Sequence, residues 1–295
     1  MPEASIVTPE LLRTMPLPDY AADADKSVYG KLLIVAGSRN CPGAALLAAR
    51  AALRSGCGSV RVAAPASVAV MMGIAVPELY VIPLPETQEG TLAAAALAGL
   101  EAQFRVCRAL LLGPGLGEHA ETRDLCRELI AGAPLPMLID AQGLAGLEPL
   151  LGSRFPAARL ISPHGGEMAR LCGGSPADTD AERVAADFAK GYGIVTVLKG
   201  QRTLIAEPAG RLFCNLAGTR GLGTAGSGDV LAGVIASLLT QRMDPVAAAC
   251  WGVYLHALAG EEVARELGDD GLMAHDLLER LPLIQRRLRQ NMNGA

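Results

Sequence analysis

The chain has 295 residues, of which 51% are hydrophobic, 19% charged and only 3% aromatic, and its formal net charge is −4. Intrinsic disorder needs low hydrophobicity and high net charge, so this composition excludes it, and it argues against a nucleic-acid binder, which usually carries a basic face. The seven cysteines form no Cys-x-x-Cys pair, no signal peptide is visible, and no apolar stretch is long enough to span a bilayer. We therefore expect a protein of the reducing cytoplasm.

Short, continuously apolar segments alternate with helical stretches along most of the chain. The predicted strands cover 31–37, 59–65, 80–85, 109–115, 137–141, 159–165 and 194–200. The predicted helices between them cover 43–56, 67–76, 92–103, 120–131, 166–173 and 180–191. Apolar strands that are separated by helices indicate a mostly parallel sheet covered on both faces.

The pattern changes after residue 200. Two short strands within 203–215 surround Pro208-Ala209-Gly210, which indicates a hairpin at one edge of the sheet. After Gly226 the chain is predicted as helical, with stretches near 227–241, 245–267 and 275–290. No linker divides the chain, so we expect one domain over 29–290, preceded by an N-terminal extension over 1–28.

Glycines crowd the segment that precedes and opens the 227–241 helix, at Gly221, Gly223, Gly226 and Gly228. Glycine lets backbone N–H groups approach an anion, and a helix N-terminus adds a partial positive charge. The segment therefore predicts a cradle for a phosphate or an oxyanion. It matches neither the GxxxxGK[ST] pattern nor a GxGxxG turn directly after a first strand.

Asp229 lies in the first turn of this helix. In one interpretation it only complements the helix dipole. In the other it accepts a proton from a substrate hydroxyl while the cradle holds the charge of a transferring phosphoryl group. The dipole is expected to lower the pKa of its carboxyl and make it a weak base.

Three further segments follow predicted strands, and each has a functional and a purely structural interpretation. In KGQRT, Lys199 and Thr203 either contact a phosphate or form a tight turn with a solvated lysine. In PHGGE, His164 and Glu167 either face a ligand or cap a helix. GPGLG at 113–117 is either a ligand loop or a plain turn. The other histidines, which have no partner pattern and are expected to be structural, are His119, His256 and His275.

Together these segments resemble the ADP- or ATP-dependent dehydratases that repair hydrated NADH and NADPH, a branch of the ribokinase-like superfamily. The matching segments stand in the family's order: GKLLIVAGSRNCPGAALLAARAALRSGCGSVRVAAP, LLLGPGLG, LIDAQGL, ISPHGGEMARL, VLKGQRTLIA and GLGTAGSGDVLAGVIASLL. The resemblance implies a ribokinase-like α/β sandwich of three layers, with a mostly parallel sheet, helices on both faces and an edge hairpin. It also implies a homo-oligomer such as a tetramer.

The resemblance assigns roles residue by residue. It implies that Asp229 is the catalytic aspartate, which lies beside the substrate hydroxyl and helps to deprotonate it. The positions implied to contact the substrate are Ala44, Gly115, Gly117, His164 and Asp229. Those implied to contact the adenine nucleotide are Lys199, Gly200, Gln201, Arg202, Thr203, Gly226, Ser227 and Gly228. No metal ligand is assigned, although Mg²⁺ is implied as a cofactor. None of the aromatic residues lies in the matched motifs, so we expect no aromatic cage around either ligand.

The implied reaction acts on the S-epimer of the hydrated dinucleotide. Its 6-hydroxyl is phosphorylated by ADP or ATP, and phosphate, a far better leaving group than hydroxide, is then eliminated to restore NAD(P)H. No epimerase domain precedes the matched segments, so epimerisation of the same metabolite is expected from a separate protein.

The chain departs from the family pattern at two positions. Ala225 stands where the family often has glycine, and its methyl group is expected to crowd the cradle or to shift its φ preference. Gln142 stands where the family often has a second acid, which would weaken any metal or water site there.

Two alternatives remain open. The GSGD cradle alone also fits a ribokinase-like kinase of a small vitamin-precursor alcohol, such as a thiazole or a pyrimidine. A non-catalytic nucleotide-binding protein on the same scaffold fits Ala225 and Gln142 as signs of decay.

Overall fold

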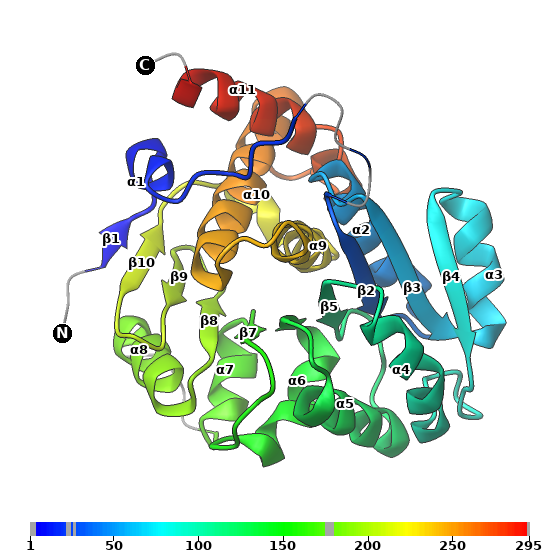
Figure 1. The fold of residues 1–295 in the computed structure, drawn as a ribbon. Helices are drawn as coiled ribbons and strands as arrows, with labels where there is room; N and C mark the ends of the chain where they lie inside the picture. Colours follow the sequence, from blue (N-terminus) through cyan, green and yellow to red (C-terminus); the bar gives the residue numbers. More distant parts are fainter. Residues whose placement is uncertain (1–3, 22–24, 26–27, 175–179, 294–295) are drawn as a thin grey trace.

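The computed structural model describes residues 4–21, 25, 28–174 and 180–293. Within these residues the strands are β1 (Ser5–Ile6), β2 (Lys31–Val35), β3 (Ser59–Pro65), β4 (Leu79–Leu84), β5 (Ala109–Leu112), β6 (Met137–Ile139), β7 (Arg159–Ile161), β8 (Val195–Leu198), β9 (Thr203–Ala206) and β10 (Leu212–Asn215). They form one ten-stranded sheet in the order β1-β10-β9-β8-β7-β6-β5-β2-β3-β4 (Figure 1).

The sheet is mostly parallel, as the sequence predicted. Every pair from β4 across to β8 is parallel, whereas β9 runs antiparallel to both β8 and β10. The predicted hairpin is therefore confirmed. The segment expected as an extension adds to it, because β1 pairs with β10 and forms the outermost strand.

Helices cover both faces of the sheet and make three layers (Figure 1). Those that pack on one face are α2 (Pro42–Arg54), α3 (Ala66–Ala75), α9 (Ser227–Thr240), α10 (Pro245–Leu267) and α11 (Leu281–Asn293). Those that pack on the other are α4 (Leu97–Phe104), α5 (Ala120–Gly132), α6 (Leu144–Leu147), α7 (Gly165–Leu171) and α8 (Ala181–Tyr192). The short helix α1 (Pro9–Arg13) packs against α10 and α11.

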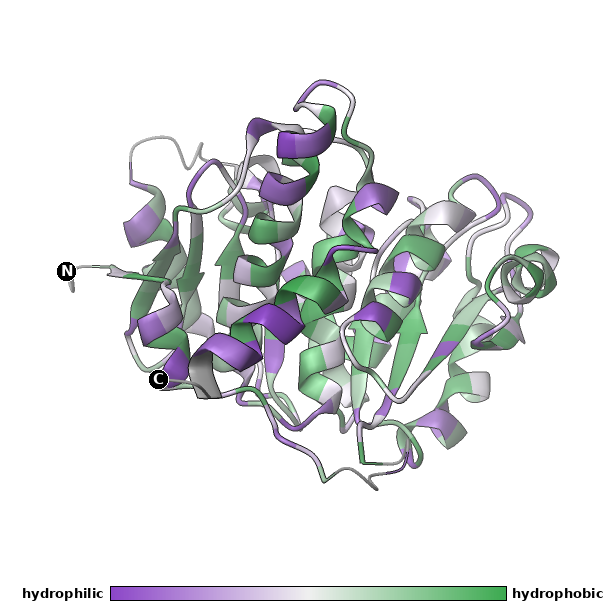
Figure 2. Cartoon of the chain, turned by 90° about the horizontal axis from the view of Figure 1, so that it is seen from above, coloured by the Kyte–Doolittle hydropathy of each residue, from purple (hydrophilic) through white to green (hydrophobic). Residues whose placement is uncertain are grey.

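Burial of the sheet on both faces explains its continuously apolar strands. Along β2, Leu32 and Ile34 enter the core beneath α9 and α10, whereas Leu33 and Val35 enter the core beneath α4 and α5. Side chains alternate across a strand, so a strand between two layers needs apolar residues at every position. Figure 2 shows this as green central strands with purple confined largely to the outer helices and loops.

The helix α9 lies unusually close to its neighbours because small residues face each other. A Cβ on Gly233 would lie 2.2 Å from the backbone oxygen of Ala48 in α2, and a Cβ on Gly252 in α10 would lie 2.4 Å from Ile235 Cγ1 in α9. No side chain larger than hydrogen fits at either contact. The alanine-rich sequence of α2 thus serves this close approach.

Most predicted elements are confirmed, and the differences have local reasons. The last helix was expected from 275 but begins at Leu281, after a 3₁₀ turn at Ala274–Leu277, and Pro282 suits its first turn. The short helix α6 was not predicted, because four residues carry no helical periodicity. Strand β4 tolerates Pro83 because it lies at the sheet edge.

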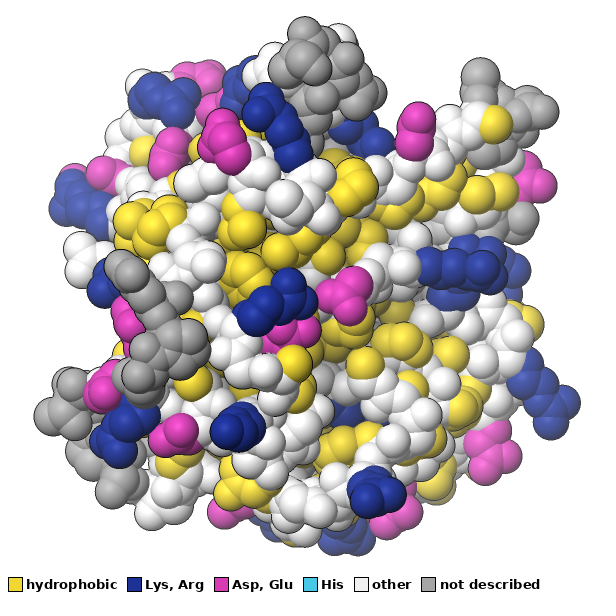
Figure 3. Space-filling view, turned by 60° about the vertical axis from the view of Figure 1, so that its left-hand side comes forward, with side chains coloured by type: hydrophobic (Ala, Val, Ile, Leu, Met, Phe, Trp, Pro, Cys, Tyr) yellow, Lys and Arg dark blue, Asp and Glu magenta, His cyan; other side chains and the backbone are white. Residues whose placement is uncertain are grey.

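No helix in the described part of the chain is both long and apolar enough to cross a bilayer. On the face shown in Figure 3, apolar side chains gather near the middle, and basic and acidic side chains are interspersed around them. That face carries no patch of a single sign of charge.

We predict that Gly233→Ala destabilises the protein by about 1–3 kcal/mol, because the added methyl group forces α9 away from α2. Urea unfolding measures the change in the free energy of unfolding. The matched control is Gly191→Ala in α8, where a Cβ meets nothing within 4 Å and helix propensity alone favours alanine. Equal free energies of unfolding for the two variants would contradict the close-packing argument.

Candidate active site

The carboxyl ends of the parallel strands meet at one edge of the sheet, and ligands of open α/β sheets bind beyond this edge. Here β5 leads into the loop 113–117, β6 into Asp140, β7 into Ser162 and β8 into Lys199. The N-terminus of α9 points to the same place, since the first-turn residue Asp229 lines a cavity with Gly115 and Gly117. The topology therefore brings together segments that lie far apart in the sequence.

The glycine cradle forms at the start of α9. Gly226 is the N-cap residue with φ +86°, and a Cβ there would lie 2.6 Å from Leu47 Cδ1. Only glycine meets both conditions. No side chain caps this helix, and the Ser227 N–H donates a 3.3 Å hydrogen bond to Thr224 O. The first-turn N–H groups that can bind an anion are therefore those of Gly228 and Asp229.

Ala225, which directly precedes the N-cap residue Gly226, is exposed. An effect of its methyl group on a ligand in the cradle stays a prediction.

A buried ion pair lies beside the cradle. Lys199 Nζ is 2.8 Å from Asp140 Oδ1, which also accepts a 2.9 Å hydrogen bond from Ser162 Oγ. Asp140 is only 1% exposed. Burial by itself lowers the pKa of Lys199, but the negative charge of Asp140, with Glu167 and Asp229 farther away, outweighs it and raises that pKa. Lys199 is therefore a protonated cation with a buried partner. It is not the solvated lysine of a plain tight turn, which was the alternative left open by the sequence.

The catalytic candidate Asp229 has an unusual environment. Burial first, and repulsion by Asp140 second, raise the pKa of its carboxyl to about 6, although Lys199 opposes the change. The expectation that the helix dipole lowers this pKa is wrong, because desolvation disfavours the charged form more strongly. A carboxylate with a pKa near 6 is ionised at neutral pH and is a better proton acceptor than an ordinary aspartate.

A cavity of about 450 Å³ opens next to Asp229. Its lining includes four of the predicted substrate residues: Ala44, Gly115, Gly117 and Asp229. Gly115 has φ +67°, and a Cβ there would lie 2.6 Å from Cys41 O and 2.8 Å from Ala44 Cβ, so glycine is required for the loop to reach α2. No Phe, Tyr or Trp of the described chain lines the cavity.

The fifth predicted substrate residue, His164, lies outside this lining. It caps α7: its Nδ1 accepts hydrogen bonds from the N–H groups of Gly166 (3.0 Å) and Glu167 (3.3 Å). Glu167 Oε2 in turn accepts a 2.8 Å hydrogen bond from the His164 N–H. The capping interpretation is thus confirmed, and a contact between His164 and substrate stays a prediction.

The loop 199–203 connects β8 to β9 as a tight turn. Arg202 forms a 3.0 Å ion pair with Glu182, and Thr203 Oγ1 donates a 3.4 Å hydrogen bond to Gly200 O, while Gln201 is exposed. Lys199 reaches the cradle, since a Cβ on Gly228 would lie 3.5 Å from its Nζ. Contacts of the other loop residues with a nucleotide stay predictions.

The side chains of Ser227, a predicted nucleotide contact, and of its neighbour His256 face away from the cradle. The Ser227 side chain is buried, and its Oγ lies 3.0 Å from Nε2 of His256, whose pKa burial lowers to about 4. The Ser227 backbone is engaged as well, because its N–H donates to Thr224 O at 3.3 Å and its carbonyl oxygen lies 3.0 Å from His256 Nε2. A contact between Ser227 and a nucleotide stays a prediction. His256 is neutral and structural, as expected, and His275 lies 3.4 Å from Asp276 in a short turn.

Sequence reasoning missed two residues at this site. His119, expected to be structural, caps α5 by accepting a 3.2 Å hydrogen bond from the Glu121 N–H, but it also lines the cavity. Asp140 anchors Lys199, and the sequence signal that could have found it is an acid directly after a predicted strand. Gln142, which the sequence analysis did single out, lines the cavity, and its buried Oε1 has no hydrogen-bond partner in the described protein.

Within the described residues, no group of three or more His, Cys, Asp and Glu side chains is arranged to hold a metal ion by itself. Asp229 lies in the first turn after the cradle, and Asp140 is close enough to Asp229 to raise its pKa.

Comparison with known proteins points to one family. A family model described as NAD(P)H-hydrate dehydratase matches residues 32–283. The ADP-dependent (S)-NAD(P)H-hydrate dehydratase of Xanthomonas campestris is 38% identical, over 97% of this chain and 98% of that protein. A bifunctional NAD(P)H-hydrate repair enzyme of Moorella thermoacetica is 40% identical over 94% of this chain but only 53% of its own, so the chain spans about half the length of that relative.

The solved structures agree. The ADP/ATP-dependent NAD(P)H-hydrate dehydratase of Bacillus subtilis, co-crystallised with ATP and Mg²⁺, superposes with a TM-score of 0.82 and 29% sequence identity, covering 97% of this chain and 99% of that chain. A ribokinase-like protein of Enterococcus faecalis, at 23% identity and a TM-score of 0.83 over 97% of this chain and 96% of that chain, has the same fold.

We predict that Asp140→Asn lowers the pKa of Asp229 from about 6 toward the ordinary aspartate range, because it removes the repelling charge and frees Lys199. Carboxyl-carbon NMR titration measures the midpoint. Asp124→Asn on the exposed face of α5 is the matched control and should leave the midpoint unchanged. A midpoint in the ordinary range in the unaltered protein would refute the assigned environment.

Proposed function

Because the chain belongs to the NAD(P)H-hydrate dehydratase family, we propose that it converts the S-epimer of hydrated NADH or NADPH back to NAD(P)H, with ADP or ATP as phosphoryl donor. The observation that carries the proposal is the position of Asp229. It follows the cradle at Gly226 and Gly228, and it lines the cavity formed with Ala44 and Gly115. One carboxylate therefore faces both an anion site and a substrate site.

In the first step, Asp229 accepts the proton of the 6-hydroxyl group of the hydrated ring. The hydroxyl oxygen bonds to the terminal phosphorus of the nucleotide, and the bond from that phosphorus to the bridging oxygen breaks. The N–H groups at the start of α9 and the Lys199 ammonium face the charge that develops on the phosphoryl oxygens. The pKa of about 6 keeps Asp229 ionised at neutral pH.

In the second step, the C6–O bond breaks and phosphate leaves with the bonding electrons. A proton is lost from C5, and the C5–C6 double bond of the dihydropyridine forms. Phosphate leaves far more readily than hydroxide, which explains why a dehydration would use a nucleotide. The residues that we propose for nucleotide contact are Lys199, Gly200, Gln201, Arg202, Thr203, Gly226, Ser227 and Gly228, the last three through their backbone.

We propose Mg²⁺ as the metal. It usually binds through one or two carboxylates together with substrate phosphates, and Asp140 and Asp229 beside the cradle fit such a donor set. Gln142 supplies a neutral oxygen in place of a second acid, so the metal would depend on Asp140, Asp229 and the nucleotide. When bound, the metal neutralises phosphate charge.

We also propose a cytoplasmic location, one catalytic domain over 29–290, and an epimerase that acts on the same metabolite. All seven cysteines are free thiols, which suits a reducing compartment. An enzyme that acts only on the S-epimer needs an epimerase that converts the other epimer into it.

We propose further that the protein is a homo-oligomer, such as a tetramer. Large apolar side chains are exposed on α3 and the adjoining edge strand β4: Val70, Met71, Ile74 and Tyr80 are 63%, 59%, 76% and 58% exposed. An apolar face of this kind commonly marks a protein interface.

The activity test incubates the protein with hydrated NADH and either ADP or ATP. We expect the near-ultraviolet absorbance of the dihydronicotinamide ring to return, with release of phosphate and of AMP or ADP. Asp229→Asn should lower kcat by about 10²–10⁴-fold, the usual contribution of a general base, with little change in nucleotide binding by calorimetry.

The result that would refute the dehydratase proposal is no recovery of absorbance with either nucleotide by folded protein. Phosphorylation of a thiazole or pyrimidine alcohol in parallel reactions would favour the kinase alternative, and nucleotide binding without turnover would favour the non-catalytic one. A wild-type rate in Asp229→Asn would show that the catalytic assignment is wrong.

For the assembly, we predict that Ile74→Glu produces smaller species in sedimentation velocity, because it buries a charge in the α3 interface. Leu267→Glu is the control, since Leu267 is 55% exposed at the end of α10, away from α3. A monomeric wild-type protein, or an unchanged assembly in Ile74→Glu, would contradict the proposal.

A further inference from the structure

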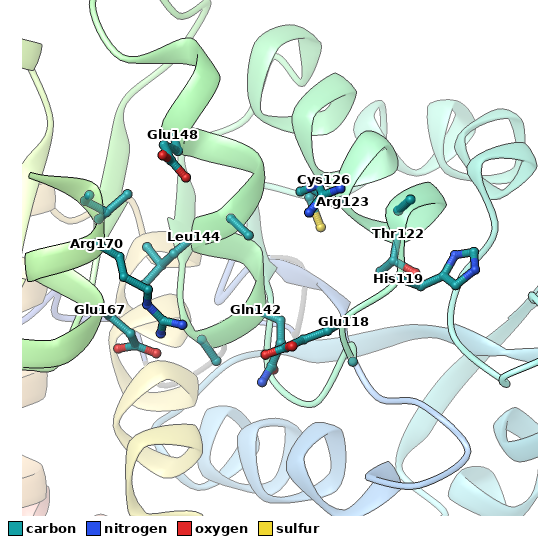
Figure 4. Close-up of a pocket in the computed structure, with 15 residues that line it drawn as sticks. Glu118, His119, Thr122, Arg123, Cys126, Gln142, Leu144, Glu148, Glu167 and Arg170 are labelled. Carbon is teal, nitrogen blue, oxygen red and sulfur yellow. The ribbon is translucent and has the colours of Figure 1, made fainter. Parts of the chain in front are cut away.

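The N–H groups of Gly228 and Asp229 can bind an anion only if the first turn of α9 holds them in the right direction. No side chain of the described protein caps this helix. The cavity between α5, α6 and α7, which Figure 4 shows, is lined by no described residue of α9, so its lining does not hold the turn. A hydrogen bond from α10 does reach the turn, and it comes from the buried side chain of His256.

His256 contacts Ser227 twice through one ring nitrogen. Its Nε2 lies 3.0 Å from Ser227 O and 3.0 Å from Ser227 Oγ, and both residues are buried. Burial lowers the pKa of His256 to about 4, so the ring is neutral and carries a single N–H. A carbonyl oxygen can only accept a hydrogen bond, so this N–H must be on Nε2, and Nδ1 must be unprotonated.

The carbonyl group that His256 contacts belongs to the same peptide group as the Gly228 N–H. A trans peptide group is planar, and its C=O and N–H point in opposite directions. No peptide bond among the described residues is cis. A hydrogen bond that fixes the Ser227 C=O toward α10 therefore also fixes the Gly228 N–H, which points out of the helix N-terminus into the cradle.

Gly228 faces the cation of the site, because a Cβ on it would lie 3.5 Å from Lys199 Nζ. Lys199 is also close enough to His256 for its charge to lower the pKa of the ring further. A hydrogen bond to a peptide oxygen polarises the peptide group and strengthens its N–H as a donor. A donor that is oriented in advance needs no reorganisation when charge develops on a phosphoryl group.

Packing alone does not explain a histidine at this position. The other buried residues of α10 are apolar side chains and glycines. A polar group costs free energy to bury unless it forms a hydrogen bond, and Ser227 is the only hydrogen-bond partner of the ring among the described residues. The hydrogen-bonding role of His256 is therefore confined to the start of α9.

We propose that His256 is a positioning residue for the phosphoryl donor. Through Ser227 O it holds the peptide group between Ser227 and Gly228, so that the Gly228 N–H donates to a phosphate oxygen of the nucleotide. In this role His256 touches neither the substrate nor the nucleotide. The inference rests on the proposed function, because it takes the cradle as the site of the ADP or ATP phosphates.

The test compares dissociation constants for ADP, ATP and NADPH, measured by calorimetry. His256→Leu removes the N–H donor and should weaken ADP and ATP binding about fivefold, the effect of one neutral hydrogen bond, while it changes the NADPH constant by less than twofold. His256→Gln keeps a side-chain N–H at a similar reach and should restore most of the affinity. The matched control is Val253→Ala, which loosens the packing of the same helix and should leave all three constants unchanged.

Nuclear magnetic resonance supplies a readout that a general loosening of α10 would not move. In the unaltered protein, the ring nitrogen shifts of His256 should show a protonated Nε2 and an unprotonated Nδ1. In His256→Leu the Gly228 amide proton should move upfield, because the oxygen of its peptide group loses a hydrogen bond. In Val253→Ala that proton should keep its shift.

The other outcomes overturn the proposal. Nucleotide constants that are unchanged in His256→Leu would exclude the positioning role, and constants that rise as much in His256→Gln or in Val253→Ala would leave only packing. The opposite tautomer in the unaltered protein would overturn it even if His256→Leu failed to fold. Protein that binds both nucleotides but does not dehydrate hydrated NADH would contradict the proposed function alone, whereas no nucleotide binding in the unaltered protein would overturn both.

Discussion

The close packing of α9 against α2 and α10 is the constraint on which the site depends. Gly233 lets α9 touch the backbone of α2, and Gly252 lets α10 touch α9 at Ile235. This contact places Gly226, Gly228 and Asp229 at the carboxyl edge of the sheet. Such close packing requires a composition that is rich in small residues and poor in aromatic ones. It leaves the cavity beside Asp229 lined, within the described chain, by glycines, alanines, small polar side chains and charged groups.

The charges at the site are linked in a chain of three groups. Asp140 is fixed by Ser162 and Lys199, which both contact its Oδ1. Its charge acts on Asp229, where it adds to the effect of burial and raises the pKa to about 6. Lys199 lies next to the cradle and would meet a bound phosphate while keeping its contact with Asp140. The base and the anion site that we propose are thus both influenced by the same ion pair.

The sequence predicted the fold well because apolar strands and amphipathic helices are local patterns. It also located Ala44, Gly115, Gly117 and Asp229, which the structure brings into one cavity. The partner of Lys199, 59 residues away at Asp140, depends on sheet order, and no local pattern encodes it. The pKa of Asp229 was predicted in the wrong direction because the helix dipole is visible in the sequence, whereas burial and the distance to Asp140 are not.

The antiparallel hairpin explains how two loops reach one site. Because β9 runs opposite to β8, the turn 199–203 leaves and re-enters the sheet at the edge where the parallel strands end. Because β10 reverses again, Asn215 pairs with Thr203, and the chain leaves β10 at this same edge on its way to Gly226. A parallel β9 would need a crossover and would begin at the opposite edge. The break in the parallel pattern therefore returns the chain to the edge where β8 delivers Lys199, and the glycine cradle forms beside that side chain.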